Sequence, residues 1–197
     1  TATISSISAS SARTRSLAMA SSIWAGGGIG PNRSSHSAAT SATSANVVTL
    51  DIGGTSADVS LLADGEPSVV HNRWLAGFPL RLPALDVNAV GAGGGSIAWI
   101  DRDGLLKVGP KSAGALPGPA CYGLGGEEAT VTDANVLLGR LPSEALLDGR
   151  MSIRRDLAEA AVDRLAEQLQ MSREDTALGI VQVACATIVK AIRAISV

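Results

Sequence analysis

The block Asp-Ile-Gly-Gly-Thr-Ser-Ala-Asp at residues 51–58 has residue types and spacing that suit phosphate chemistry. Two glycines separate two short apolar runs, so the chain is expected to turn tightly there with successive backbone N–H groups facing outward. Because Gly53 and Gly54 have no Cβ, an anion can approach the backbone closely. The hydroxyls of Thr55 and Ser56 add two donors. The block therefore predicts a phosphate-binding turn.

A carboxylate on each side of the glycines extends this prediction to a metal ion. Asp51 ends the first apolar run, and Asp58 lies in the second. Mg²⁺ keeps most of its water and uses few carboxylates, so Asp51 is a candidate to hold a Mg²⁺-bound water. A plain β-hairpin with a Gly-Gly turn is the alternative. The hydroxyls and the two aspartates favour the phosphate loop.

A second glycine-rich block, Gly-Ala-Gly-Gly-Gly-Ser, occupies residues 91–96. Consecutive glycines after a strand permit either a close approach to a ligand or tight packing of the backbone. Gly93, Gly94 and Gly95 are therefore candidates for cofactor contact. The block does not fit the dinucleotide fingerprint G-x-G-x-x-G, because Ser96 stands where the third glycine would be, and it lacks the Gly-Lys pair of a P-loop.

Residues 112–123 place a cysteine beside a tyrosine, which suggests a nucleophile. A cysteine nucleophile needs a base, and the two histidines of the chain, His36 and His71, both precede this block. Cys121 is therefore predicted to be a buried structural thiol.

The block Thr-Val-Thr-Asp-Ala-Asn at residues 130–135 carries alternating polar side chains. This alternation predicts an extended segment that runs into an apolar stretch. A turn or a helix cap is the alternative.

The elements that must position these blocks change from strands to helices near residue 150. Strands are predicted by β-branched or alternating runs bounded by turn residues, at 47–50, 57–62, 68–72, 87–90, 96–100 and 105–108. An ordered irregular loop is expected over 110–126. Apolar residues at helical spacing predict two helices, 153–170 and 173–196, packed on a sheet unit formed by 47–140. Ser172 and Asp175 resemble a capping box.

The composition fits a globular protein and excludes several classes. Apolar residues make up 46% of the 197-residue chain and charged residues 17%. The net charge of −2 argues against nucleic-acid binding, which needs a basic surplus. The two cysteines, Cys121 and Cys185, form no metal or disulfide pattern and suit a reducing cytoplasm. No apolar run approaches the roughly 20 residues that span a bilayer.

Residues 1–46 differ in composition from the rest. Of these residues 28 are Ser, Ala or Thr, and none is acidic. No helical or strand period can be followed, so the segment is expected to be disordered or foreign to the fold, making few contacts. An organelle transit peptide is an alternative.

Together, the phrases DIGGTS, GAGGGSIAW, SAGALPGPACYG and TVTDAN resemble the ATP-dependent hydantoinase A/5-oxoprolinase family, which includes ketone carboxylase subunits. The resemblance covers nearly all of residues 47–196. It implies an α/β fold: part of one lobe of an actin/sugar-kinase/Hsp70-like nucleotide-binding fold, in which two lobes close on ATP.

The resemblance also implies roles for the residues. Gly53, Gly54, Thr55 and Ser56 would form the second phosphate loop, with Asp51 as the catalytic and Mg²⁺-binding carboxylate. ATP and Mg²⁺ would activate the amide or carbonyl oxygen of a small cyclic amide or ketone. A hydantoinase B-type subunit would be the partner, in the cytoplasm and without nucleic acid or membrane.

The sequence departs from the family pattern in three places. The phosphate loop of the first lobe is not found, the adenosine segment is expected beyond Val197, and residues 20–46 do not match the Ser-Gly-Pro-Ala-Ala-Gly-like stretch that usually precedes the loop. The chain is therefore predicted to be a central fragment that is inactive by itself. A non-catalytic remnant, a ketone carboxylase subunit and a sugar-kinase or Hsp70 relative are the alternatives.

Overall fold

The computed structural model describes residues 18–21, 46–75, 77–142, 145–146 and 151–196. Its strands are β1 (Ala18–Ser21), β2 (Val47–Ile52), β3 (Ala57–Ala63), β4 (Glu66–Pro67), β5 (Val69–Val70), β6 (Arg73–Leu75), β7 (Phe78–Leu80), β8 (Ala84–Leu85), β9 (Val87–Val90), β10 (Ser96–Ile100), β11 (Leu106–Ser112), β12 (Ala145–Leu146) and β13 (Met151–Ser152). Its helices are the 3₁₀ turn η1 (Ala120–Tyr122), α2 (Val131–Leu137), α3 (Arg155–Leu169) and α4 (Arg173–Ser196).

The main sheet is built on the β2–β3 hairpin. Its antiparallel register runs from Val47 opposite Leu62 to Ile52 opposite Ala57, so the turn falls at residues 53–56 as the sequence predicts. β1 adds a parallel strand beside β2, and β9 an antiparallel strand beside β3. The predicted hairpin is confirmed. The mixed α/β class is confirmed as well.

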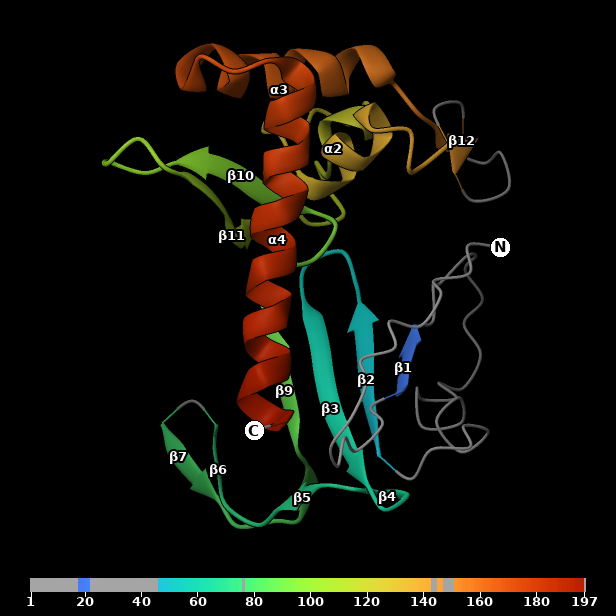
Figure 1. Ribbon diagram of the computed structural model, residues 1–197, viewed down its shortest axis with the longest axis vertical. Coiled ribbons are helices and arrows are strands. Elements are labelled where there is room, and N and C mark those ends of the chain that lie inside the picture. The colour runs from blue at the N-terminus through green and yellow to red at the C-terminus, as the bar shows by residue number, and fades with distance from the viewer. Residues whose placement is uncertain (1–17, 22–45, 76, 143–144, 147–150, 197) are drawn as a thin grey trace, which may run out of the picture.

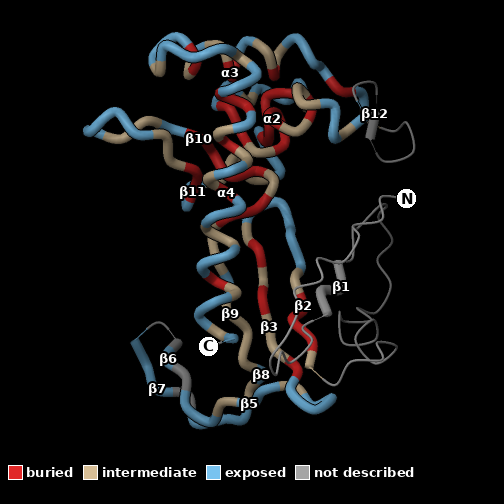
Figure 2. The backbone as a smooth tube through the Cα atoms, viewed as in Figure 1, coloured by how far each residue is buried: buried red, intermediate tan, exposed pale blue. Residues whose placement is uncertain are grey.

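Helix α4 joins the two parts of the molecule (Figure 1). Its first half packs through Ile180 and Ala184 into a cluster shared with α2, α3 and β11. Its second half packs through Ala191 against Val48 and Val59 of the sheet. Figure 2 shows buried residues in both parts. The predicted apolar stripe of this helix is therefore core, as expected.

By length and composition α4 could also cross a membrane, which differs from the expectation that no apolar run is long enough. A core helix of a soluble protein meets the same criterion. In this structure the helix buries one stripe against the sheet and the other helices, and it exposes Leu178 and Val189.

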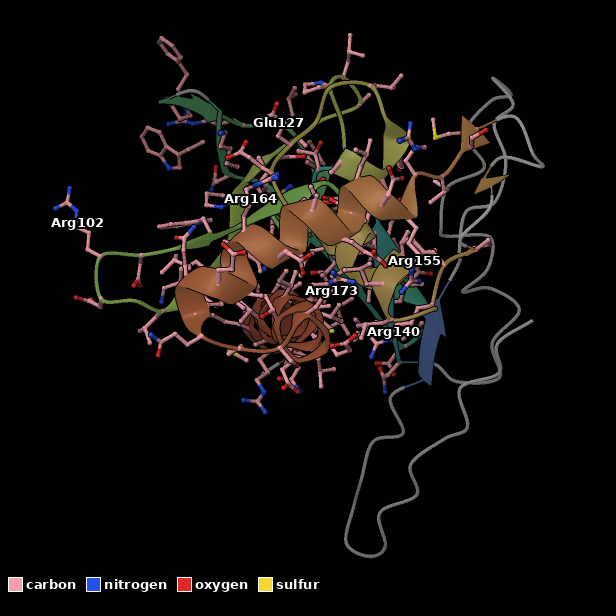
Figure 3. All side chains as sticks on the ribbon, turned by 90° about the horizontal axis from the view of Figure 1, so that it is seen from above. Arg102, Glu127, Arg140, Arg155, Arg164 and Arg173 are labelled. Atoms are coloured by element: carbon pink, nitrogen blue, oxygen red, sulfur yellow. The ribbon has the colours of Figure 1, made fainter. Side chains whose placement is uncertain are left out.

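The guanidinium group of Arg173 links α4 to α3. Arg173, the first residue of α4, donates two hydrogen bonds of 2.7 Å to the carboxylate of Asp163 and lies 3.3 Å from that of Glu159 (Figure 3). Ser172 and Asp175 form the predicted cap: the Ser172 hydroxyl accepts from the Asp175 N–H at 3.1 Å.

The prediction of an extended segment at residues 130–135 is wrong, and the alternative of a helix cap is confirmed. Thr130 is the N-cap of α2, and Asp133 completes a capping box with it. The Asp133 carboxylate accepts from the Thr130 N–H at 2.9 Å, and the Thr130 hydroxyl accepts from the Asp133 N–H at 3.3 Å. These reciprocal bonds satisfy donors that a helix start leaves open, so they favour the helix over a strand.

Two other segments differ from the sequence expectations. The strand predicted at 68–72 is only the two-residue β5, paired with β8, and a further hairpin, β6–β7, follows. Within residues 1–46, Ala18–Ser21 pair with β2, so these four residues differ from the expectation of few contacts. Residues 1–17 and 22–45 lie outside the described part. The hairpin predicted at 96–100 and 105–108 is confirmed as β10–β11, with β11 longer than expected.

Candidate functional site

The β2–β3 turn is the centre of the candidate site. It points toward the helical part of the molecule (Figure 1), and the Gly53 N–H closes it by donating to the Ser56 carbonyl at 2.8 Å. Gly53, Gly54 and Thr55 are exposed, whereas Ser56 is half-buried. A Cβ added to Gly54 would meet no atom within 4 Å, so space for a ligand exists at this residue.

The second glycine block packs directly behind this turn. The Gly94 N–H donates to the Gly53 carbonyl at 2.9 Å, and the Gly95 N–H donates to the Gly54 carbonyl at 2.5 Å. A Cβ on Gly93 would lie 2.6 Å from the Gly53 oxygen, so only glycine fits. Of the two interpretations from the sequence, tight packing is therefore realised.

The N–H groups of Gly93, Gly94 and Gly95 all bond inside the chain. The Gly93 N–H donates to the Ser96 hydroxyl at 2.9 Å, and those of Gly94 and Gly95 hold the turn. Contact of Gly93, Gly94 and Gly95 with a cofactor stays a prediction.

The bonds to the two turn carbonyls fix where the N–H groups of the turn point. The peptide bonds after Gly53 and Gly54 are trans, so each N–H points opposite to the carbonyl of its own peptide. The Gly54 and Thr55 N–H groups therefore point away from the second glycine block. Within the described part of the chain neither has a hydrogen-bond acceptor. Two successive backbone donors without an acceptor in the described part, on an exposed turn, suit the binding of an anion.

Two carboxylates flank the turn on one face of the hairpin. Asp51 lies directly opposite Asp58, and like charges in that arrangement repel unless a cation lies near them. Asp51 is exposed and Asp58 half-buried, and among the described residues neither has an ion-pair partner. No group of three or more His, Cys, Asp or Glu side chains suited to a metal occurs in that part of the chain. A cation here would need oxygen ligands from water and from a bound phosphate.

A serine that the sequence analysis did not single out borders the turn. The Ser112 hydroxyl lies 3.5 Å from the Thr55 hydroxyl and accepts from the Gly114 N–H at 3.1 Å. A cavity of about 340 Å³ opens beside it, lined in part by Ile97, Leu116 and the ion-paired Lys111 and Glu128. Ser112 is the first residue of the block at 112–123, and this position in a motif could have identified it as a candidate site residue.

The cysteine of that block is structural, as predicted. Cys121 is fully buried, and burial raises the pKa of its thiol, with the nearby Asp133 charge adding to the effect. Burial also raises the pKa of Tyr122, and the proximity of Cys121 and Asp133 contributes further. The Asp133 carboxylate accepts from the Cys121 N–H at 2.8 Å and from the Ala120 N–H at 3.3 Å, so it ties this loop to α2.

The chain is similar to proteins of known activity. It is 44% identical over 153 residues to the caprolactamase subunit alpha of Pseudomonas jessenii, a match that covers 77% of this chain and 22% of that protein. The crystal structure of the ATP-dependent caprolactamase from the same organism matches with a TM-score of 0.69 at 43% identity, over 77% of this chain and 22% of the other. A nucleotide-free acetone carboxylase structure matches with a TM-score of 0.69 at 32% identity, over 76% and 21%.

The family model of the hydantoinases and oxoprolinases matches residues 5–197. The matched region thus begins within the low-complexity segment. It also includes both glycine blocks and the α2 cap. The chain belongs to the hydantoinase/oxoprolinase family.

Proposed function

We propose that the β2–β3 turn binds phosphate groups of ATP as part of an ATP-dependent enzyme that activates the amide oxygen of a small cyclic amide. The observation that supports the proposal is that the N–H groups of Gly54 and Thr55, on an exposed turn, have no acceptor among the described residues. Backbone donors that are fixed in advance suit the charge of a phosphoryl group.

Mg²⁺ fits beside this turn. Asp51 and Asp58 supply negative charge without a protein cation among the described residues, and Asp51 would hold a metal-bound water. With its metal, the nucleotide supplies the phosphoryl group that makes the amide carbonyl a better electrophile. The residues of this chain bind that group and orient it: the turn N–H groups and the Thr55 and Ser56 hydroxyls face it, and Asp51 neutralises its cation.

The proposal also concerns the rest of the enzyme to which this chain would belong. The chain spans 22% of the caprolactamase subunit it matches, and one lobe of an actin-like fold would supply only one of the two phosphate hairpins that clamp a nucleotide. We therefore expect ATP turnover below about 1 s⁻¹ from this chain by itself. We also propose a partner subunit of the hydantoinase B type, which is supported by the name "subunit alpha" of the caprolactamase. A cytoplasmic location is proposed as well, since the two free cysteines suit a reducing compartment.

Carboxylation of a ketone is the second candidate, favoured by the likeness to acetone carboxylase. Both reactions start with phosphorylation of an oxygen atom, so the turn would serve either. Phosphate release from the full-length enzyme complex, with Mg-ATP and either a cyclic amide or a ketone plus bicarbonate, separates them.

The binding proposal is tested by calorimetric titration of the chain with Mg-ATP. Gly54→Ala fills the open space at the turn without touching protein, so we expect the fold to persist and the affinity to fall about tenfold or more, since a bound oxygen can no longer reach the backbone. Asp51→Asn should weaken the dependence on Mg²⁺, whereas the control Asp64→Asn, an exposed aspartate just past the far end of β3, should not. Equal affinity in the parent chain and Gly54→Ala would contradict the proposal.

A further inference from the structure

The second glycine block and α2 form two chains of hydrogen-bonded peptide groups. These end at the Gly54 and Thr55 N–H groups, which have no acceptor in the part of the protein that the structure describes. In the first, the Ser96 N–H donates to the Gly93 carbonyl at 3.1 Å, and the N–H of that same peptide, on Gly94, donates to the Gly53 carbonyl at 2.9 Å. The peptide of the Gly53 carbonyl carries the free N–H of Gly54.

The second chain starts at α2. Thr132 donates twice to the Gly94 carbonyl, from its N–H at 2.8 Å and from its hydroxyl at 2.9 Å. The N–H of that peptide, on Gly95, donates to the Gly54 carbonyl at 2.5 Å. The peptide of the Gly54 carbonyl carries the free N–H of Thr55.

Hydrogen bonds in series polarise one another, because each bond to a carbonyl strengthens the N–H of the same peptide as a donor. Two donors on the Gly94 carbonyl therefore strengthen the Gly95 N–H, and through it the Thr55 N–H. The geometry is also rigid: Thr132 is 8% exposed, and an added Cβ on Gly94 would lie 2.9 Å from its hydroxyl.

We infer that residues 93–95 act as a peptide relay, and that Thr132 is a positioning residue that orients and strengthens the Thr55 N–H toward a phosphate oxygen. Thr132 itself touches no ligand in this scheme. The identity of the ligand rests on the proposed function, but the relay does not. The effect of the relay is asymmetric. The chain of hydrogen bonds that starts at Thr132 ends at the Thr55 N–H, whereas the one that starts at Ser96 ends at the Gly54 N–H.

The test compares Thr132→Val, which removes only the hydroxyl from a side chain of nearly the same shape, with Thr132→Ser, which restores it. Thr187→Val is the matched control: its hydroxyl donates to the Val183 carbonyl at 3.1 Å within α4, outside the relay. Amide ¹H–¹⁵N spectra of the ligand-free chain report the relay directly. We expect the Gly95 and Thr55 amide protons to move upfield in Thr132→Val, with Gly54 moving less, and to return in Thr132→Ser.

Titration with Mg-ATP and with inorganic phosphate completes the test. Loss of one hydrogen bond in the relay should weaken binding by about threefold to tenfold in Thr132→Val, and neither Thr132→Ser nor Thr187→Val should do so. If the amide shifts occur but neither the parent protein nor any variant binds Mg-ATP or phosphate, the relay is supported and the proposed function is refuted. If the Thr55 amide is unchanged, or moves equally in Thr187→Val, the relay is refuted.

A further measurement covers the case in which Thr132→Val does not fold. Scalar couplings across the hydrogen bonds from Gly94 ¹⁵N to the Gly53 carbonyl carbon, and from Gly95 ¹⁵N to that of Gly54, can be measured in the unmodified chain. Both couplings are expected. Their absence would overturn the relay.

Discussion

Asp133→Asn is expected to destabilise the chain far more than the same substitution at a matched surface site. Asp133 has no exposed surface. Its Oδ2 accepts from the Thr130 N–H at 2.9 Å, the Thr130 hydroxyl at 2.7 Å and the Ala120 N–H at 3.3 Å, and its Oδ1 accepts from the Cys121 N–H at 2.8 Å. One carboxylate thus closes the α2 cap and holds the loop before it.

The size of the destabilisation follows from the hydrogen bonds that an asparagine side chain at this position cannot accept. Its NH₂ group must replace one oxygen, and the less costly choice is Oδ1, where only the Cys121 N–H loses its acceptor. A buried donor left without a partner costs about 1–3 kcal/mol. The three remaining bonds also lose the assistance of a charge, so we expect a total near 3 kcal/mol. Asp175 occupies the corresponding place after Ser172 but is exposed, so Asp175→Asn should cost less than about 1 kcal/mol.

Urea unfolding at pH 7, followed by circular dichroism, measures both variants. The midpoints should differ and the slopes should not, since the surface exposed on unfolding is the same. If Asp133→Asn and Asp175→Asn lowered the free energy of unfolding equally, the argument that buried donors depend on the Asp133 carboxylate would be refuted.

Three further outcomes are expected. Under native conditions at pH 8, iodoacetamide should alkylate the exposed Cys185 and leave the buried Cys121 intact, with both modified after denaturation, as mass spectrometry would show. Thr176→Val should leave stability unchanged or raise it by about 1 kcal/mol in urea unfolding, because the buried Thr176 hydroxyl has no partner in the described part of the chain. Hydrogen bonds from Arg173 hold the pKa of Asp163 below its ordinary value of 3.8. The ionised Asp163 carboxylate therefore stabilises the folded state above pH 3.8, and this stabilisation is lost as pH falls through the lower pKa of the folded state. Thermal melts between pH 6 and pH 3 should show a shallower loss for Asp163→Asn than for the parent chain.

Most of the longer elements could be predicted from the sequence. The β2–β3 hairpin, the β10–β11 hairpin and helices α3 and α4 lie where the periods of two and of about 3.6 place them. These periods are properties of neighbouring residues, so they need no knowledge of the rest of the fold. The two-residue strands β4 and β8 could not be predicted, since such short strands carry no period of their own.

The block at residues 130–135 shows where prediction from local sequence patterns fails. Its polar alternation looks like a strand, yet the structure uses Thr130 and Asp133 as a helix cap. The cap depends partly on donors from η1, which the sequence places well before it. A local pattern does not contain that information.

The sequence by itself determined that a glycine turn flanked by aspartates and hydroxyls joins β2 to β3, because turn chemistry is local. It could not determine which way the peptides of that turn face. That is decided by hydrogen bonds from Gly94 and Gly95, and behind them from Thr132, all distant along the chain. Only the tertiary structure brings these carbonyls and N–H groups to hydrogen-bonding distance, and the direction of a free N–H is fixed once the carbonyl of its own peptide is held.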